Sequence, residues 1–163
     1  MNICVEEHHG YFTLDMCCYN GNGFCNSSIQ GMRLSLIYIP SGHGSLYLNE
    51  REISYDAPAL LCINESDTID IPNSAAVQAI LFHPSVINTS LDFENIRSIS
   101  DSLDITAQQD CFYFQPFLNR HTDFCGVLFP TFDTSSKIEK LFATFSAQIT
   151  LQDSNYWACR SRS

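Results

Sequence analysis

Basic residues are scarce in this sequence. Lys and Arg together number 8 against 18 Asp and Glu, so the formal net charge is −10 with neutral histidines. Apart from Arg160 and Arg162, the basic residues are scattered along the chain. Nucleic-acid binding depends on clustered Lys and Arg that neutralise phosphates and release counterions. The composition therefore argues against nucleic-acid binding by this segment itself.

Long apolar runs and an export signal are lacking too. No run reaches the ~18 consecutive apolar residues of a membrane-spanning helix. Glu6 and Glu7, with no Lys or Arg before the first apolar stretch, do not resemble a secretory signal peptide. Hydrophobic residues make up 45% of the chain and charged residues 16%, which excludes disorder and indicates apolar surface reserved for a partner. We expect a soluble cytoplasmic protein without a membrane partner.

The eight cysteines include no CxxC pair that would nucleate a zinc site. We expect most of them to be reduced thiols that pack as small hydrophobes, with Cys62 in the apolar run LLCI as the clearest case. Cys17, Cys18 and Cys25 lie in a stretch rich in Gly and Asn, and a redox role for them stays open.

Catalytic motifs are missing from the chain. There is no Gly-x-Ser-x-Gly, and Gly21-Asn22-Gly23 is not followed by the Lys-Ser/Thr of a phosphate-binding loop. Adjacent carboxylates such as Glu6 and Glu7 are more simply explained as solvated. We therefore expect no catalytic residues.

Short apolar strands dominate the region from 32 to 83. Alternating or continuous apolar runs predict strands over 32–39, 45–49, 52–54, 59–64, 68–71 and 76–82. Strands at such close spacing, with no helical period between them, favour antiparallel meanders that close into a sandwich or barrel. Residues 1–31 are expected to be irregular, and 111–117 to be a strand or a short helix.

The C-terminal part has a helical period. From Ser136 to Leu151 the apolar residues step by three, one, three and four and form one helix face: Ile138, Leu141, Phe142, Phe145 and Ile149. A second helix is expected from about Asp153. Because the pattern is interrupted at Ser163, we expect the sequence to be part of a longer protein.

The order of these segments resembles a known family. The stretch IYIPSGHGSLYLNEREISYDAPALLCINESDTIDIP, then VQAILFHPSVI, and finally SKIEKLFATFSAQI with YWACRSRS, looks like the N-terminal effector-binding and dimerisation region of AraC-type transcriptional regulators. The resemblance covers roughly residues 30–163. It implies a mainly β fold, a cupin-like double-stranded β-helix barrel over residues 1–133, and two α-helices in a dimerisation and linker segment over 134–163. The family's DNA-binding helix-turn-helix module is absent from this chain.

The resemblance also implies a function. The barrel would bind a small-molecule effector, such as a sugar or a small anion, and the helical stripe from Ile138 to Ile149 would pair with a second copy to form a homodimer. DNA would be bound only through the missing module. Arg33 is a candidate ligand for an anion if its face is inward, and a solvated rim residue otherwise. The full set of effector-binding candidates is Arg33, Tyr38, Ser41, Tyr47, Asn64, Val77 and Ala79.

Two alternatives stay open. A stand-alone cupin enzyme, an isomerase or dioxygenase, would need a metal, but none of the five histidines forms the His-x-His pair of such sites. We therefore expect no metal and no cofactor. A carbohydrate-binding β module would need an open aromatic platform, for which Tyr11, Phe12, Tyr38 and Tyr47 are the candidates.

Overall fold

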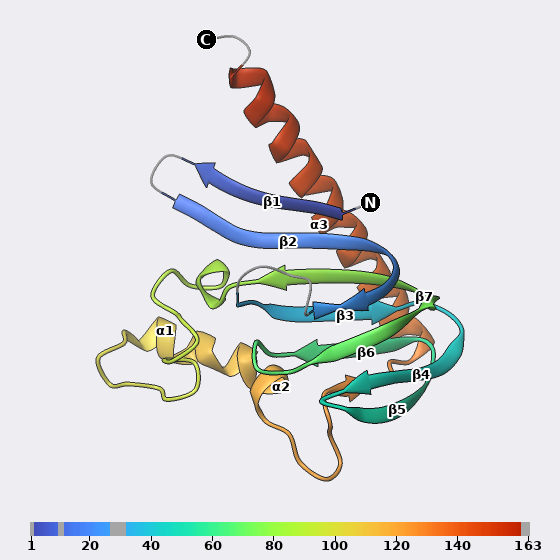
Figure 1. Ribbon diagram of the computed structural model, residues 1–163. Coiled ribbons are helices and arrows are strands. Elements are labelled where there is room, and N and C mark those ends of the chain that lie inside the picture. The colour runs from blue at the N-terminus through green and yellow to red at the C-terminus, as the bar shows by residue number, and fades with distance from the viewer. Residues whose placement is uncertain (1, 10–11, 27–31, 161–163) are drawn as a thin grey trace.

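The computed structural model describes residues 2–9, 12–26 and 32–160, with side chains described for 16–26 and 32–147. A curled antiparallel sheet forms most of the molecule, and a long C-terminal helix crosses one of its faces (Figure 1). The strands are β1 (Asn2–His9), β2 (Phe12–Cys25), β3 (Leu34–Ile39), β4 (His43–Leu48), β5 (Arg51–Asp56), β6 (Ala59–Ile63), β7 (Ile69–Phe82) and β8 (Val127–Leu128). The helices are α1 (Ile105–Asp110), α2 (Gln115–Leu118) and α3 (Phe132–Arg160), with 3-10 turns η2 (Pro84–Val86) and η3 (Cys111–Phe114).

Strand β7 organises the sheet. The strand order is β1-β2-β7-β3-β6-β8, and β4 pairs with β5 and with the start of β7. All the pairings are antiparallel. The expected class, mainly β with a C-terminal helical part, is confirmed.

The expectation of an irregular N-terminal region was wrong, because β1 and β2 occupy most of residues 1–25. Their sequence, with Asn20-Gly21-Asn22-Gly23, reads locally as a turn. Pairing with β7 from Met16 to Cys25 overrides that local preference.

A bulge explains why two expected strands, 68–71 and 76–82, are one continuous strand. The register between β2 and β7 shifts between Asn22 and Phe24, so Pro72 is not paired with a residue of β2. Its missing N–H therefore removes no hydrogen bond between the two strands. Gly23 lies at the bulge with φ +71, and a Cβ there would be 2.5 Å from Asn73 Oδ1. Only glycine fits this close approach of two strands.

The central strands β3 and β6 are buried on both faces. Alternate residues of β3, β6 and β7 line an inner core, including Ile37, Leu61 and Val77. The opposite, outer face is covered in two places. Helix α3 packs against Tyr38 and Ile80, and the segment from α1 to α2 packs against Leu34 and Cys62.

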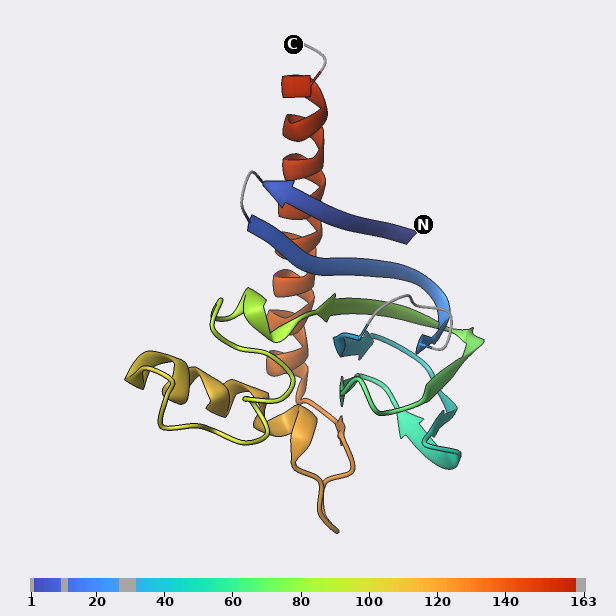
Figure 2. The same cartoon turned by 60° about the vertical axis from the view of Figure 1, so that its left-hand side comes forward.

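Helix α3 is continuous from Phe132 to Arg160 and does not break near Asp153 as expected. The sequence contains neither Gly nor Pro between Phe132 and Arg160, so nothing interrupts the backbone hydrogen bonds. The helix begins earlier than Ser136, since Thr131 Oγ1 accepts a hydrogen bond from the Thr134 amide. Figure 2 shows it running past β1 at the end of the sheet. In the described residues no helix is long and apolar enough to cross a membrane.

Residues 111–117, expected to be a strand or a short helix, are helical as η3 and the start of α2. Their buried residues recur at helical spacing, with Cys111, Phe114 and Phe117 facing the outer side of the sheet. The aromatic content alone did not decide between the two structures.

Candidate functional site

The inner face of the sheet is the first part of the candidate site. Val77 and Ala79 on β7 lie in the inner core, each 1% exposed, beside Ile37 and Ile39 on β3. Their contact with an effector stays a prediction. Small side chains recur on this face, at Ala59, Ala75 and Ala79.

Arg33 lies at the end of this inner face. It precedes Leu34, the first residue of β3, and its side chain is half-buried. Residues that alternate along a strand share a face, so Arg33 continues the row of Ser35 and Ile37, and Ser35 is itself buried. A cation is therefore placed next to a buried polar residue at the margin of an otherwise apolar core.

Tyr38 faces the other side of the same strand, so it does not line the inner core as a barrel-lining candidate would. It is completely buried beneath α3, and its hydroxyl lies 2.9 Å from Glu139 Oε1 and 3.2 Å from Ser135 Oγ. Its ring centroid is 5.9 Å from that of Phe142. Burial raises the pKa of Tyr38; the Ser135 hydrogen bond opposes this rise, and Glu139 adds to it. The phenol stays protonated at neutral pH and donates to Glu139.

The helical stripe is divided between two roles. Ile138 and Phe142 pack on the sheet of the same chain, whereas Leu141 and Phe145 are 58% and 39% exposed. The side chain of Ile149 lies outside the described residues. Only part of the candidate dimer interface is therefore available to a second molecule.

Three further candidates lie away from the inner face. Ser41 is exposed in the turn before β4, and Tyr47 on β4 is exposed to solvent. Asn64 is committed to local structure: its Oδ1 accepts hydrogen bonds from the Ser66 and Asp67 amides, and its Nδ2 donates to the Phe117 carbonyl. These contacts show why a polar residue is needed at position 64 without invoking an effector.

The aromatic platform expected of a carbohydrate-binding module does not form from Tyr38 and Tyr47. Tyr38 is enclosed by α3, while Tyr47 is exposed on β4. The side chains of Tyr11 and Phe12 lie outside the described residues.

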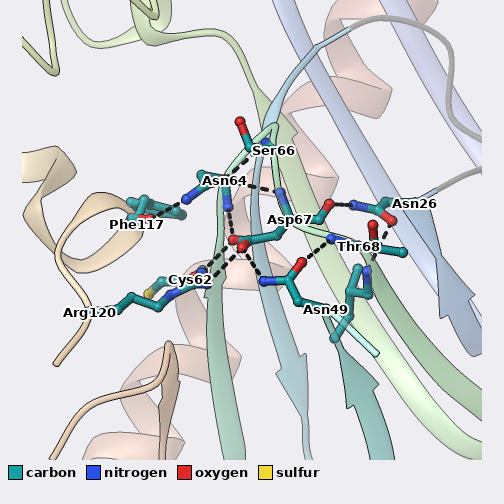
Figure 3. A network of polar contacts seen from close by, with 10 residues as sticks. Asn26, Asn49, Cys62, Asn64, Ser66, Asp67, Thr68, Phe117 and Arg120 are labelled. Atoms are coloured by element: carbon teal, nitrogen blue, oxygen red, sulfur yellow. Dashed lines mark hydrogen bonds and ion pairs between the residues drawn. The ribbon is translucent and has the colours of Figure 1, made fainter. Parts of the chain in front are cut away.

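Sequence analysis missed a network around Asp67 (Figure 3). Arg120 donates to both carboxylate oxygens of Asp67, at 2.7 and 2.5 Å, and to the Cys62 carbonyl at 3.0 Å. Asn49 and the Asn64 amide donate to the same carboxylate at 2.8 and 2.9 Å. The network ties the loop at Arg120 to the turn between β6 and β7, 53 residues away in sequence.

The electrostatics of this network indicate a structural role. Burial alone would raise the pKa of Asp67, but hydrogen bonds from Arg120, Asn49 and the Asn64 amide, with the charge of Arg120, lower it. Burial raises the pKa of the adjacent Cys62 to about 11, with Arg120 opposing the rise. Asp67 is thus ionised with both oxygens engaged, and Cys62 is a neutral thiol, so neither group is available for acid–base or nucleophilic chemistry.

Metal-ligating residues do not converge in the part of the chain with described side chains. No group of three or more His, Cys, Asp or Glu lies there in an arrangement that could hold a metal ion. His43 is exposed in β4, and His83 Nδ1 accepts a hydrogen bond from the Ser85 amide at the start of η2.

Comparisons with known proteins assign no family. No protein-family model matches the sequence, and no curated protein matches it.

Proposed function

We propose that this chain is the effector-sensing and dimerisation domain of an AraC-type transcriptional regulator. In this proposal the curled sheet is a cupin-like double-stranded β-helix barrel that holds a small molecule, α3 pairs with a second copy, and both control a DNA-binding module. The observation that carries the proposal is the position of β3. Its inner residues Ile37 and Ile39 line the core, and between them Tyr38 contacts α3 on the opposite face.

The inner face supports effector binding. The face is apolar, with Ala59, Ala75 and Ala79 among its buried residues, and ligand sites are mostly apolar with a few polar groups that fix orientation. Arg33 and Ser35 supply such groups at the end of the face. A guanidinium there suits an anionic effector or the hydroxyls of a sugar.

The exposed side of α3 supports pairing with a second copy. Leu141 and Phe145 are one helical turn apart and face solvent, next to Ile138 and Phe142, which pack on the sheet. Exposed apolar stripes on helices are typical of protein interfaces. The helix also continues beyond the sheet, where a second helix could lie alongside it (Figures 1 and 2).

Coupling between the two parts follows from thermodynamics. An effector changes dimerisation or DNA binding only if its affinity differs between two arrangements of the domain. A shift of β3 caused by an effector would reach α3 through the Tyr38 hydroxyl and the Phe142 ring. We place the protein in the cytoplasm and assign it no enzymatic activity, no cofactor and no DNA binding of its own.

Dimerisation is tested by sedimentation velocity. We expect a dimer, and we expect the double variant Leu141→Ser/Phe145→Ser to weaken it at least tenfold. Phe132→Ser is the matched control, since Phe132 is 83% exposed but lies nine residues from Leu141, on the opposite side of the helix. A wild-type chain that stays monomeric at 100 µM contradicts the dimerisation proposal.

Effector binding is tested by thermal shift with a pentose, a hexose, citrate, acetate and inorganic phosphate. A ligand at one hundred times its Kd stabilises by about 2.7 kcal/mol, which raises Tm by roughly 5–10 °C for a chain of this size. Arg33→Met should abolish the shift from an anion, while the exposed Arg51→Met should not. An anion that binds both variants equally contradicts the role of Arg33. Stoichiometric iron, manganese or zinc in the purified protein would favour a cupin enzyme.

A further inference from the structure

One cysteine departs from the expected reduced state. Cys17 on β2 is disulfide-bonded and lies in the inner core, 6% exposed. Five other cysteines form no disulfide, which agrees with the expectation for most of the chain: Cys18, Cys25, Cys62, Cys111 and Cys125.

Elimination and strand register identify the partner of Cys17. Of the eight cysteines, only Cys4 and Cys159 remain once Cys17 and the five cysteines that form no disulfide are set aside. Cys4 is directly opposite Cys17 in the pairing of β1 with β2. Opposed residues of an antiparallel pair have Cα atoms about 4.5–5.5 Å apart, within the roughly 4.4–6.8 Å that a disulfide requires. Cys159 lies near the end of α3, which runs beyond the sheet (Figure 1).

We propose that Cys4 and Cys17 form a cross-strand disulfide that fastens β1 to the sheet, and that a dithiol reductant releases it. In the exchange, a thiolate of the reductant attacks one sulfur and the S–S bond breaks. This forms a mixed disulfide and releases the other cysteine as a thiol. The second thiol of the reductant then attacks the reductant sulfur of the mixed disulfide and displaces the remaining cysteine, leaving two cysteine thiols in the protein and a disulfide in the reductant. Two electrons and two protons pass to the protein.

The position of β1 makes this bond consequential. Within the described ranges, β1 is the terminal strand of the sheet and pairs only with β2, while α3 contacts it from the outer face. Cys18, the neighbour of Cys17, packs against the same helix. Releasing the bond therefore loosens the strand that lies beside the exposed part of α3.

The neighbouring thiol does not open the bond by itself. Cys18 lies on the opposite face of β2 from Cys17, and burial raises its pKa, with a hydrogen bond to Ser146 opposing the rise. A protonated thiol is a poor nucleophile in disulfide exchange. Disulfides in reducing compartments are mostly transient or redox-sensing. The regulatory role of this bond therefore rests on the proposed cytoplasmic function, whereas the existence of the bond does not.

The bond is tested by peptide mapping of the full chain, alkylated without reductant. We expect one linked pair of peptides containing Cys4 and Cys17, and six titratable thiols in denaturant, since two of the eight cysteines are in the bond. Eight thiols, or a link from Cys17 to Cys159, overturns the proposal.

The release of β1 is tested by hydrogen exchange before and after reduction with a thioredoxin-type dithiol. Reduction should speed exchange in residues 2–9 at least tenfold and leave β3 to β6 unchanged. Cys4→Ser should reproduce this effect and lower Tm by roughly 5–10 °C, whereas Cys125→Ser, at an exposed free thiol, should do neither. If the bond is present but reduction leaves exchange unchanged, redox control of β1 is wrong. Dimerisation measured on the same samples tests the proposed function separately.

Discussion

Replacing Asp67 with Asn tests whether the network around Arg120 stabilises the fold. The substitution keeps the shape of the side chain but removes the charge that faces the guanidinium. Arg120 would keep its hydrogen bond to the Cys62 carbonyl and lose its only ion-pair partner among the described residues. The Asp67 and Arg120 side chains are 6% and 22% exposed, so solvent replaces the lost contact only in part.

The expected cost follows from that burial. Breaking a fully buried ion pair costs about 3–5 kcal/mol. Because Arg120 is partly exposed, and because an Asn oxygen still accepts from Asn49 or the Asn64 amide, we expect a loss of about 2–4 kcal/mol in the free energy of unfolding. This corresponds to a fall in Tm of roughly 5–15 °C for a chain of this length.

The assay is urea unfolding followed by circular dichroism at pH 7, with Asp70→Asn as the matched control. Asp70 is exposed on β7, so its variant should stay within about 0.5 kcal/mol of wild type. If Asp67→Asn also stays within that margin, the ion pair does not stabilise the fold and the reasoning fails.

The difference in unfolding free energy between wild type and Asp67→Asn should also depend on pH, which supplies a second check. The folded-state pKa of Asp67 is lowered from an ordinary value of 3.8, so the folded state holds the proton less readily than the unfolded chain. The stabilisation is fully present above the unfolded pKa and is lost as the pH falls through the folded pKa. The gap between wild type and Asp67→Asn should therefore be constant near neutrality and shrink below about pH 4. A gap that widens on acidification would show that the sign of the shift is wrong.

Three further predictions concern α3 and the bulge. Tyr38→Phe should cost about 1–2 kcal/mol, because it leaves the buried Ser135 hydroxyl without the Tyr38 contact; thermal unfolding measures it, and no change would show that the phenol is dispensable. Phe142→Ala should cost about 3–4 kcal/mol in the same assay, because Phe142 is buried, and the exposed Leu141→Ala less than about 1 kcal/mol. Equal costs would mean that a different face of α3 packs on the sheet. Gly23→Ala should cost more than about 1 kcal/mol, because φ is +71 and the new Cβ meets Asn73; a neutral result in urea unfolding would exclude the bulge.

The strands from β3 to β7 could be predicted because their apolar alternation is strong and their turns are well marked. β1 and β2 could not, since Asn20-Gly21-Asn22-Gly23 has the composition of a turn and becomes a strand only through pairing with β7. Local sequence does not contain that pairing. The same limit applies to Pro72, whose place in a strand depends on a bulge in a neighbour 49 residues earlier, at Gly23.

The candidate site was predictable only in part, because both faces of the central strands β3 and β6 are buried. Alternation assigns Ile37 and Tyr38 to opposite faces of β3, but it cannot say which face is the inner core and which lies under a helix. Tyr38, an effector-binding candidate, lies on the face under α3. The Asp67–Arg120 pair has no local signal, since its members come from separate loops and meet only in the folded chain.

Helix α3 extends well beyond the part of it that packs on the sheet. Among the described side chains, its contact with the sheet extends to Ser146, which hydrogen-bonds Cys18. Its axis continues to Arg160, 14 residues further on, a length of about 21 Å at 1.5 Å per residue. A tilt of about 10° where α3 leaves the sheet would displace the far end by about 4 Å. Displacements of a few tenths of an ångström beside Tyr38 are thereby magnified at the end of α3.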